Sequence, residues 1–257
     1  MHTTIPTTMT TPPTARPARA FTAWARRNPG RARVDGDLGR LGLLRLVSPS
    51  LPVGAYAGSE GLEYAVEAGW LPGESEVLEW LGGRLAHSLC RLDIPLLARF
   101  HAAWRAGDSA ALARWSAFLV ASRETAELAA HDRSLGRALA RLLGDLGVAR
   151  ARPLAEGANA SYPAAFALAA DEWSIPLEAA AEGYLFAWLE GQVAAAIKLV
   201  PLGQTQGQRI LGALLGEIPR LAAEGCALAD DAIGFSEPGL AIASALHESQ
   251  YARLFRS

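Results

Sequence analysis

The chain has 257 residues, and a domain of this length buries about 70–75% of the surface that its unfolded form exposes. Its formal net charge of -2 gives no general attraction to nucleic acid or to anionic membranes, and no apolar run reaches the roughly 20 residues that span a bilayer. The two cysteines, Cys90 and Cys226, cannot form a disulfide framework, so we expect a cytoplasmic protein. Ala and Leu dominate the composition and favour helices, which predicts an all-α, single-domain helical bundle.

The first 40 residues differ from the rest of the chain. They are rich in Thr, Pro, Ala and Arg, and their first acidic residue is Asp35. Such a segment buries too little apolar surface to offset the entropy lost on ordering, which predicts a disordered N-terminal extension. An Arg-rich targeting leader and a basic arm that contacts a partner are the alternatives. The folded domain then covers residues 41–257.

Helical periodicity begins at Leu41 and stops at Ser48, because the residue before a proline avoids the helical region. A loop over residues 50–58 follows, and Ser59 is expected to cap the next helix, which ends at Gly69. Apolar stripes at helical spacing predict three further helices, over residues 77–85, 94–104 and 128–142.

The segment over residues 175–200 is apolar on nearly every side, which is typical of a helix at the centre of a bundle. Pro176 suits its first turn and Pro201 ends it. Buried polar groups are costly unless they are partnered, so we expect partners for the four polar residues that interrupt it, Glu182, Glu190, Gln192 and Lys198.

The rest of the chain contains two more predicted helices. One follows a polar joint over residues 203–209, runs from Ile210 to Leu221 and is expected to bend near Pro219. The last begins at about Pro238.

Motif searches exclude several classes of enzyme. There is no phosphate-binding loop, dinucleotide fingerprint, zinc-protease histidine pair or spaced Cys/His cluster, so we predict no cofactor and no metal site. His87 and Cys90 lie three apart on a helix, but two ligands are too few for a tight metal site. Ser59 with His87 or His101 suggests a small helical hydrolase, although the residues around Ser59 lack the spacing of a nucleophile elbow. We therefore favour a capping or partner-contact role for Ser59.

Charged residues follow one stretch of the helix predicted over residues 128–142. Asp132, Arg133, Arg137 and Arg141 are interpreted first as a solvated face with weak ion pairs. The alternative is a partner-facing patch, because Arg is enriched at interface hot spots. An arginine supplied in trans also stabilises phosphoryl transfer by a GTPase, so Arg133 or Arg137 could act as an arginine finger.

The final residues, 247–257, combine large apolar with cationic side chains. Tyr251, Leu254 and Phe255 would form an exposed apolar patch, which often marks an interaction site. Either this tail folds back into the core of its own chain or it is captured by a partner, and we favour capture because interface cores are enriched in Tyr, Phe and Arg.

Three separated motifs resemble the UreF family of urease accessory proteins. The resemblance covers about residues 41–257 and rests on Leu46–Tyr56 with Ser59–Glu63, on Leu185–Thr205, and on His247–Ser257. The chain departs from the family at Gly191, where a polar, Asn-like residue is expected, and in its long N-terminal extension.

The resemblance implies a non-catalytic, all-α homodimer that joins UreD (UreH in some organisms) and the GTPase UreG in delivering nickel to the urease apoprotein. It implies that the tail docks on UreD through Tyr251, Arg253, Leu254, Phe255 and Arg256. It also suggests that Ser59, Glu60, Glu63 and Lys198 face UreG or the dimer cleft, with a role in the dimer or in the core as the alternative. The tail is expected to stay mobile until UreD orders it.

Overall fold

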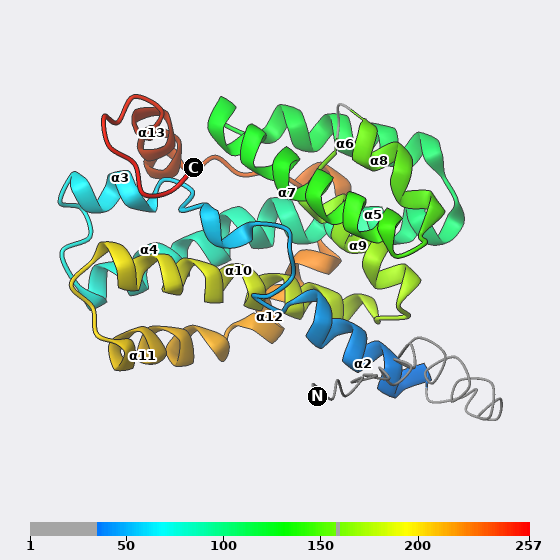
Figure 1. Cartoon of the computed structure of the whole chain (residues 1–257), viewed down its shortest axis with the longest axis horizontal. Coiled ribbons are helices and arrows are strands. Elements are labelled where there is room, and N and C mark those ends of the chain that lie inside the picture. The colour runs from blue at the N-terminus through cyan, green and yellow to red at the C-terminus, as the bar shows by residue number, and fades with distance from the viewer. Residues whose placement is uncertain (1–34, 158–159) are drawn as a thin grey trace, which may run out of the picture. The chain divides into compact units, whose positions relative to one another are not determined.

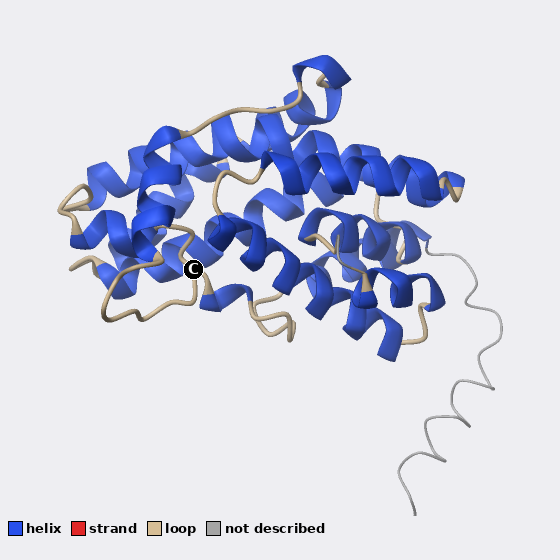
Figure 2. Cartoon of the chain, turned by 90° about the horizontal axis from the view of Figure 1, so that it is seen from above, coloured by secondary structure: helices blue, strands red, loops and turns tan. Residues whose placement is uncertain are grey.

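The computed structural model describes residues 35–157 and 160–257. Within these two ranges the chain is helical and contains no strand, which confirms the predicted all-α class (Figures 1 and 2). No helix in the described ranges is both long and apolar enough to cross a membrane. The extension predicted over residues 1–40 lies outside the described residues as far as residue 34.

The helices follow one another with short connections (Figure 1). The α-helices are α2 (Asp35–Leu46), α3 (Leu62–Glu67), α4 (Glu74–Gly83), α5 (Ile94–Ala106), α6 (Ser109–Ser122), α7 (Ala126–Asp145), α8 (Arg152–Glu156), α9 (Tyr162–Glu172), α10 (Leu177–Leu199), α11 (Gln204–Leu215), α12 (Ile218–Ala227) and α13 (Pro238–His247). A π-helix, η2 (Arg84–Asp93), joins α4 to α5, and three short 3-10 helices are η1 (Ala55–Ala57), η3 (Ala149–Ala151) and η4 (Asp230–Ala232).

Helix α10 is the central element, as the apolar residues on nearly every side of it predict. It contacts α3, α4, α5, α9, α11 and α12. Pro176 is its N-cap residue, and the helix ends before Val200 and Pro201. Gln192 is buried within it, whereas Lys198 and Glu182 point to solvent, so the partners expected for those two charges are not required.

Helices α4 and α5 are continuous through η2, which the periodicity does not predict (Figure 1). Pro95 lacks an N–H, so the carbonyl of Arg91, four residues earlier, loses its helical donor. Gly234 supplies the missing hydrogen bond to this carbonyl at 2.9 Å. The π-helix has more residues in each turn than an α-helix, and it buries both Arg84 and Asp93.

Three predicted boundaries are corrected. Helix α2 begins at Asp35 rather than at Leu41 and packs through Gly39, where a Cβ would lie 2.6 Å from the carbonyl oxygen of Ser174. Helix α3 begins at Leu62, because Gly61 adopts a left-handed φ of 82° that cannot continue a helix. Pro219 lies in the first turn of α12, so α11 and α12 are separate helices rather than one bent helix.

Candidate functional site

The final segment of the chain crosses several helices that are distant in sequence. Helix α13 packs on α3 and α7, and the residues after it return along α3 (Figure 1). The start of α13 is attached through Glu237, whose main-chain N–H donates to the carboxylate of Glu124 at 3.2 Å. The segment is therefore held by contacts to the chain's own helices along its length.

Phe255 anchors the tail in the core. Its side chain is only 6% exposed and joins the main apolar cluster, and the ammonium group of Lys198 lies 5.7 Å from its ring centre. The buried carboxylate of Glu63 accepts the main-chain N–H of Leu254 at 2.6 Å and that of Phe255 at 2.9 Å. One side chain thus satisfies two consecutive amides of the tail.

His247 connects the end of α13 to two other helices. Its imidazole is fully buried, with Nδ1 2.7 Å from Glu127 and Nε2 3.2 Å from Glu63. Arg253 lies 3.4 Å from the same oxygen of Glu127. The carboxylates of α3 and α7 therefore hold both α13 and the tail.

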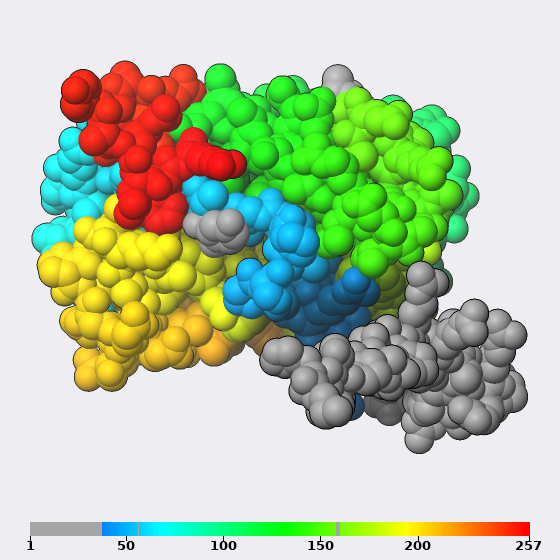
Figure 3. All heavy atoms as spheres, viewed as in Figure 1, coloured from blue at the N-terminus to red at the C-terminus, as the bar shows by residue number. Residues whose placement is uncertain are grey.

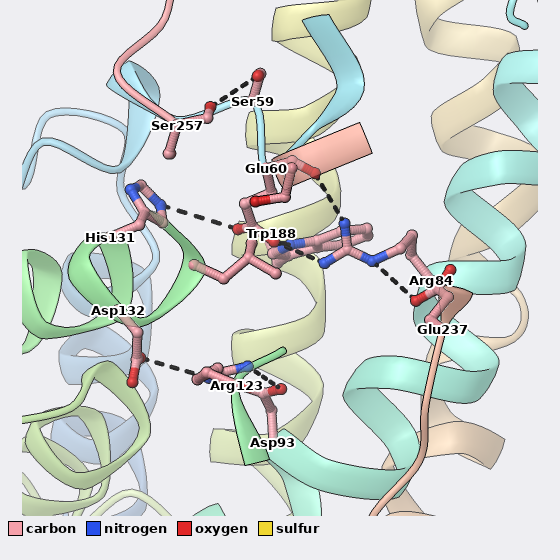
Figure 4. A network of polar contacts seen from close by, with 12 residues as sticks. Ser59, Glu60, Arg84, Asp93, Arg123, His131, Asp132, Trp188, Glu237 and Ser257 are labelled. Carbon is pink, nitrogen blue, oxygen red and sulfur yellow. Dashed lines mark hydrogen bonds and ion pairs between the residues drawn. The ribbon is translucent and has the colours of Figure 1, made fainter. Parts of the chain in front are cut away.

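The last residue is bound to the loop before α3. The main-chain oxygen of Ser257 accepts hydrogen bonds from the Ser59 amide, from the Ser59 hydroxyl at 2.7 Å and from the Glu60 amide at 2.9 Å (Figure 4). The N–H of Arg256 donates to the carbonyl of Ala57 at 2.8 Å. The loop in turn adopts unusual backbone angles, since Glu60 has a φ of 50°.

The rest of the tail faces solvent. Tyr251 is fully exposed and Leu254 is 65% exposed, and Arg253 and Arg256 are exposed beside them. Two apolar residues of α13 are also exposed. We call this set the tail surface: Ile242, Leu246, Tyr251, Arg253, Leu254 and Arg256. In Figure 3 the segment that carries it forms one continuous area at the upper left.

A cluster of buried charges lies next to the loop that binds Ser257 (Figure 4). Arg84 donates to the carboxylate of Glu60 at 2.7 Å and lies 3.3 Å from Glu237. Trp188 donates its indole N–H to Glu60 at 3.1 Å, and His131 lies 3.9 Å from the same carboxylate. Burial alone would raise the pKa of Glu60, but Arg84, His131 and these hydrogen bonds together hold it below its usual value.

A second group of buried charges adjoins the first. Arg123 lies 2.7 Å from Asp93 and 3.5 Å from Asp132, and Tyr184 donates its hydroxyl to Asp93 at 3.1 Å. Burial and the neighbouring charge of Asp93 raise the pKa of Asp132, although Arg123 opposes this. Burial also raises the pKa of Tyr162 and Tyr184.

A cavity of about 90 Å³ separates the two groups and is lined by residues of both. In the described ranges, no group of three or more His, Cys, Asp and Glu side chains is arranged to hold a metal ion. Charged groups line the cavity together with Tyr and Trp rings.

Comparisons with known proteins decide the family. The UreF family model matches residues 72–215. The chain is 55% identical to the urease accessory protein UreF of Alkalilimnicola ehrlichii over 84% of this chain and 94% of that protein. It is 48% identical to the UreF of Chromohalobacter salexigens, with the same coverage of both chains, and 46% identical to that of Marinobacter nauticus, over 86% of this chain and 96% of that protein. The chain belongs to the UreF family. Its role therefore lies in urease maturation, as an accessory protein.

Two residues of the UreF motif around Ser59 are internal. Ser59 is fully buried and Glu63 is 6% exposed, and both bind the tail, so these two cannot form an exposed face for UreG or for the dimer cleft. Their positions agree with the alternative role in the core. Glu60 is partly buried beside Arg84 and Lys198 is exposed, so a UreG or dimer-cleft role for these two residues stays a prediction.

Most of the charged residues of α7 are less exposed to solvent than the predicted solvated face requires. Arg137 is half-buried and donates to the carbonyl of Gly157 at 3.1 Å, and Arg133 is also half-buried. Asp132, predicted to lie on the same solvated face, is buried and accepts the main-chain N–H of Tyr162 at 3.0 Å. Only Arg141 is exposed as predicted.

The positions of Ser59, His87 and Cys90 do not support the hypotheses of a hydrolase or of a metal site. The Ser59 hydroxyl is fully buried and bound to Ser257, while His87 is exposed and stacks on Phe235 at 5.1 Å between ring centres. Cys90 points inward, 3.4 Å from the carbonyl of Leu221. Because both residues lie in a π-helix, a separation of three no longer places them on one face.

Several residues of the buried charged groups have no role predicted from the sequence. Arg84, Asp93 and Arg123 lie outside the three UreF-like motifs, whereas Trp188 and His247 lie within them, and all five find their partners only through tertiary contacts. One signal was available: charged residues at apolar positions of predicted helices, such as Arg84 one residue before Leu85, demand buried partners.

Proposed function

We propose that this chain is a non-catalytic scaffold of urease maturation that docks on UreD (UreH) through its tail surface. Tyr251 and Leu254 carry the proposal, because they are large apolar side chains held out into solvent by a tail whose neighbouring residue, Phe255, is buried. Exposed apolar residues flanked by arginines are typical of interface hot spots. Phe255 acts as the anchor of the tail rather than as a contact, which revises its expected role.

The anchoring changes the expected mechanism of docking. A tail that is disordered before binding loses conformational entropy when it orders, whereas a tail already seated on its own chain presents the epitope at little cost. The two amides bonded to Glu63 and the three hydrogen bonds to Ser257 hold this tail in place. We therefore propose preorganised docking in place of the coupled ordering expected from the sequence.

The remaining steps follow from the family. In our proposal the chain forms a homodimer, and the dimer recruits the GTPase UreG together with UreD for the transfer of nickel to the urease apoprotein in the cytoplasm. Two-fold symmetry gives the dimer two equivalent tail surfaces. Light scattering of the purified chain tests the first step, since a monomeric mass at micromolar concentration would contradict it.

Capture of the chain by immobilised UreD tests the docking proposal. The variant carries Tyr251→Ala and Leu254→Ala, which remove two exposed side chains and keep the main-chain bonds to Glu63. We expect capture to fall by about tenfold or more, since hot-spot truncations cost about 2 kcal/mol or more. Leu146→Ala is the matched control, because Leu146 is a 46% exposed leucine beyond the far end of α7 and should leave capture unchanged. Equal capture of the double variant and the control would refute the proposal.

A further inference from the structure

The end of the tail and the buried charged cluster share one residue. Glu60 donates its main-chain N–H to the Ser257 oxygen at 2.9 Å, and its carboxylate accepts hydrogen bonds from Arg84 at 2.7 Å and Trp188 at 3.1 Å. Figure 4 shows Ser257 on one side of Glu60 and Arg84 on the other. A single residue, Glu60, therefore contacts both Ser257 and Trp188.

The backbone of Glu60 adopts a φ angle that is unfavourable for this residue type. Its φ of 50° lies in the left-handed region, which L-residues other than glycine, Asn and Asp rarely adopt. Such angles persist only where surrounding contacts impose them. On one side the Glu60 amide bonds the Ser257 oxygen, which also accepts two hydrogen bonds from Ser59, and on the other side Arg84 donates to the Glu60 carboxylate and to its carbonyl at 3.3 Å.

The loop packs closely against the tail end and His131. A Cβ on Gly58 would lie 2.2 Å from the ring of His131 and 2.8 Å from the Ser257 hydroxyl, so backbone, imidazole and tail are packed directly together. His131 in turn faces the Glu60 carboxylate. If Ser257 leaves, the amides of Ser59 and Glu60 lose their shared acceptor inside a buried site, which costs free energy unless the loop rearranges.

From this geometry we propose that the seat of Ser257 is a conformational relay, through which the position of the tail end sets the arrangement of Glu60, Arg84 and Trp188. With the tail seated, Glu60 is held left-handed and its carboxylate is bonded to both partners. With the tail end withdrawn, Glu60 relaxes to ordinary backbone angles and its carboxylate leaves the indole of Trp188. The idea that this relay signals UreD docking to the interior rests on the proposed function. The coupling between Ser257 and Trp188 is a property of the chain alone.

Trp188 reports on the relay, because its indole N–H is bonded to the Glu60 carboxylate. The indole resonances of the full chain are recorded by nitrogen-15 NMR, and Trp188→Phe assigns the one of interest. Deletion of residues 256 and 257 should shift this resonance and speed hydrogen exchange of the indole N–H by at least about tenfold, the loss expected for one hydrogen bond of roughly 1.4 kcal/mol. Ser257→Ala is the matched control: it removes a hydroxyl with no hydrogen-bond partner and keeps the main-chain oxygen, so the resonance should not move.

The reverse direction gives a second test that does not depend on the truncated chain folding. Coupling between two sites is reciprocal, so Trp188→Phe, which keeps a ring and loses the donor, should speed amide exchange at Ser59, Glu60 and Arg256. Leu254 and Phe255 are internal controls, because their amides are bonded to Glu63 instead. An unmoved Trp188 resonance in the deletion, or unchanged exchange in Trp188→Phe, overturns the relay. Both experiments omit UreD, so either result leaves the docking proposal to the capture assay.

Discussion

The guanidinium of Arg84 lies between two carboxylates whose pKa values shift in opposite directions. Glu60 accepts hydrogen bonds from Arg84 and from Trp188, and its pKa is lowered although burial opposes this. Glu237 lies 3.3 Å from the same guanidinium, but its Oε2 has no hydrogen-bond partner. Burial and the neighbouring Glu124 therefore raise the pKa of Glu237 despite Arg84. The charges of Arg84 and His131, with hydrogen bonds from Arg84 and Trp188, lower the pKa of Glu60, whereas at Glu237 the charges of Arg84 and His87 do not offset burial and Glu124.

This difference predicts the pH dependence of stability for Glu60→Gln. A lowered pKa in the folded state adds stability above the unfolded pKa of about 4.5, and this stability is lost as the pH falls through the folded value. At pH 7 the variant should lose about 1.5–3 kcal/mol in the free energy of unfolding, the range for hydrogen bonds to charged groups. Urea titrations at pH 7 and below pH 4 measure this, and the difference from the unmodified chain should shrink at the lower pH.

Glu237→Gln is the matched variant, and the contribution of Glu237 to stability should have the opposite pH dependence. A raised pKa in the folded state means that ionisation of Glu237 opposes folding, so the unmodified chain regains stability as the pH falls through that value. At pH 7, Glu237→Gln should lower the free energy of unfolding by less than Glu60→Gln does, or should raise it. A larger loss for Glu237→Gln than for Glu60→Gln at pH 7 would contradict this assignment.

Two glycines of α10 give a prediction about packing. A Cβ on Gly191 would meet nothing within 4 Å, whereas a Cβ on Gly183 would lie 2.5 Å from Leu43. Gly191→Ala should therefore stabilise the helix by about 1 kcal/mol, and Gly183→Ala should destabilise the chain by about 1–3 kcal/mol through overpacking. Thermal unfolding of both variants measures the difference, and a destabilised Gly191→Ala would show that the site beside Gly191 is occupied.

His247→Ala should destabilise the attachment of α13. The imidazole lies between the carboxyl groups of Glu63 and Glu127, and its removal takes one hydrogen-bond partner from each of these buried groups. A buried polar group that loses a partner costs about 1–3 kcal/mol, so the free energy of unfolding should fall by that order. His87→Ala, at an exposed histidine stacked on Phe235, should cost far less. Similar losses in urea titrations of the two variants would argue against His247 as an attachment point of α13.

The arginines of α7 give a prediction about UreG. A true arginine finger supplies about a thousandfold or more in turnover. Arg137 is bonded to Gly157 and Arg133 is half-buried, so Arg133→Ala and Arg137→Ala should leave UreG turnover within the range of an exposed control, Arg141→Ala. GTP hydrolysis measured with UreG and UreD present decides this. A fall in turnover of about a thousandfold in Arg133→Ala or Arg137→Ala would support the GTPase-activating hypothesis.

The sequence predicts most of the long helices, because their apolar spacing is a local property, but it gives no prediction for α6, α8 and α9. Helix α10 and the start of α13 at Pro238 lie where periodicity and proline place them. Apolar periodicity does not predict the π-helix, where Gly234, from a distant part of the chain, donates to the carbonyl of Arg91. The helix start at Leu62 was missed because Gly61 takes a left-handed φ.

The candidate site was predictable only in part. Composition indicates that Tyr251 and Leu254 are unusual near a chain end, and both are exposed. Composition does not distinguish Leu254 from Phe255, although one faces solvent and the other is buried, because the carboxylate of Glu63 fixes the backbone between them. The buried role of Ser59 and Glu63 likewise depends on contacts across more than 180 residues.

Hydroxyl-radical footprinting of Tyr251 in the presence of UreD tests whether the tail surface is the docking site. Tyr251 is fully exposed in the chain alone, and Trp70, 40% exposed beyond α3, serves as the reference on the same molecule. We expect saturating UreD to suppress oxidation of Tyr251 severalfold and to leave that of Trp70 unchanged. Oxidation of Tyr251 at the same rate with and without bound UreD would contradict docking through the tail surface.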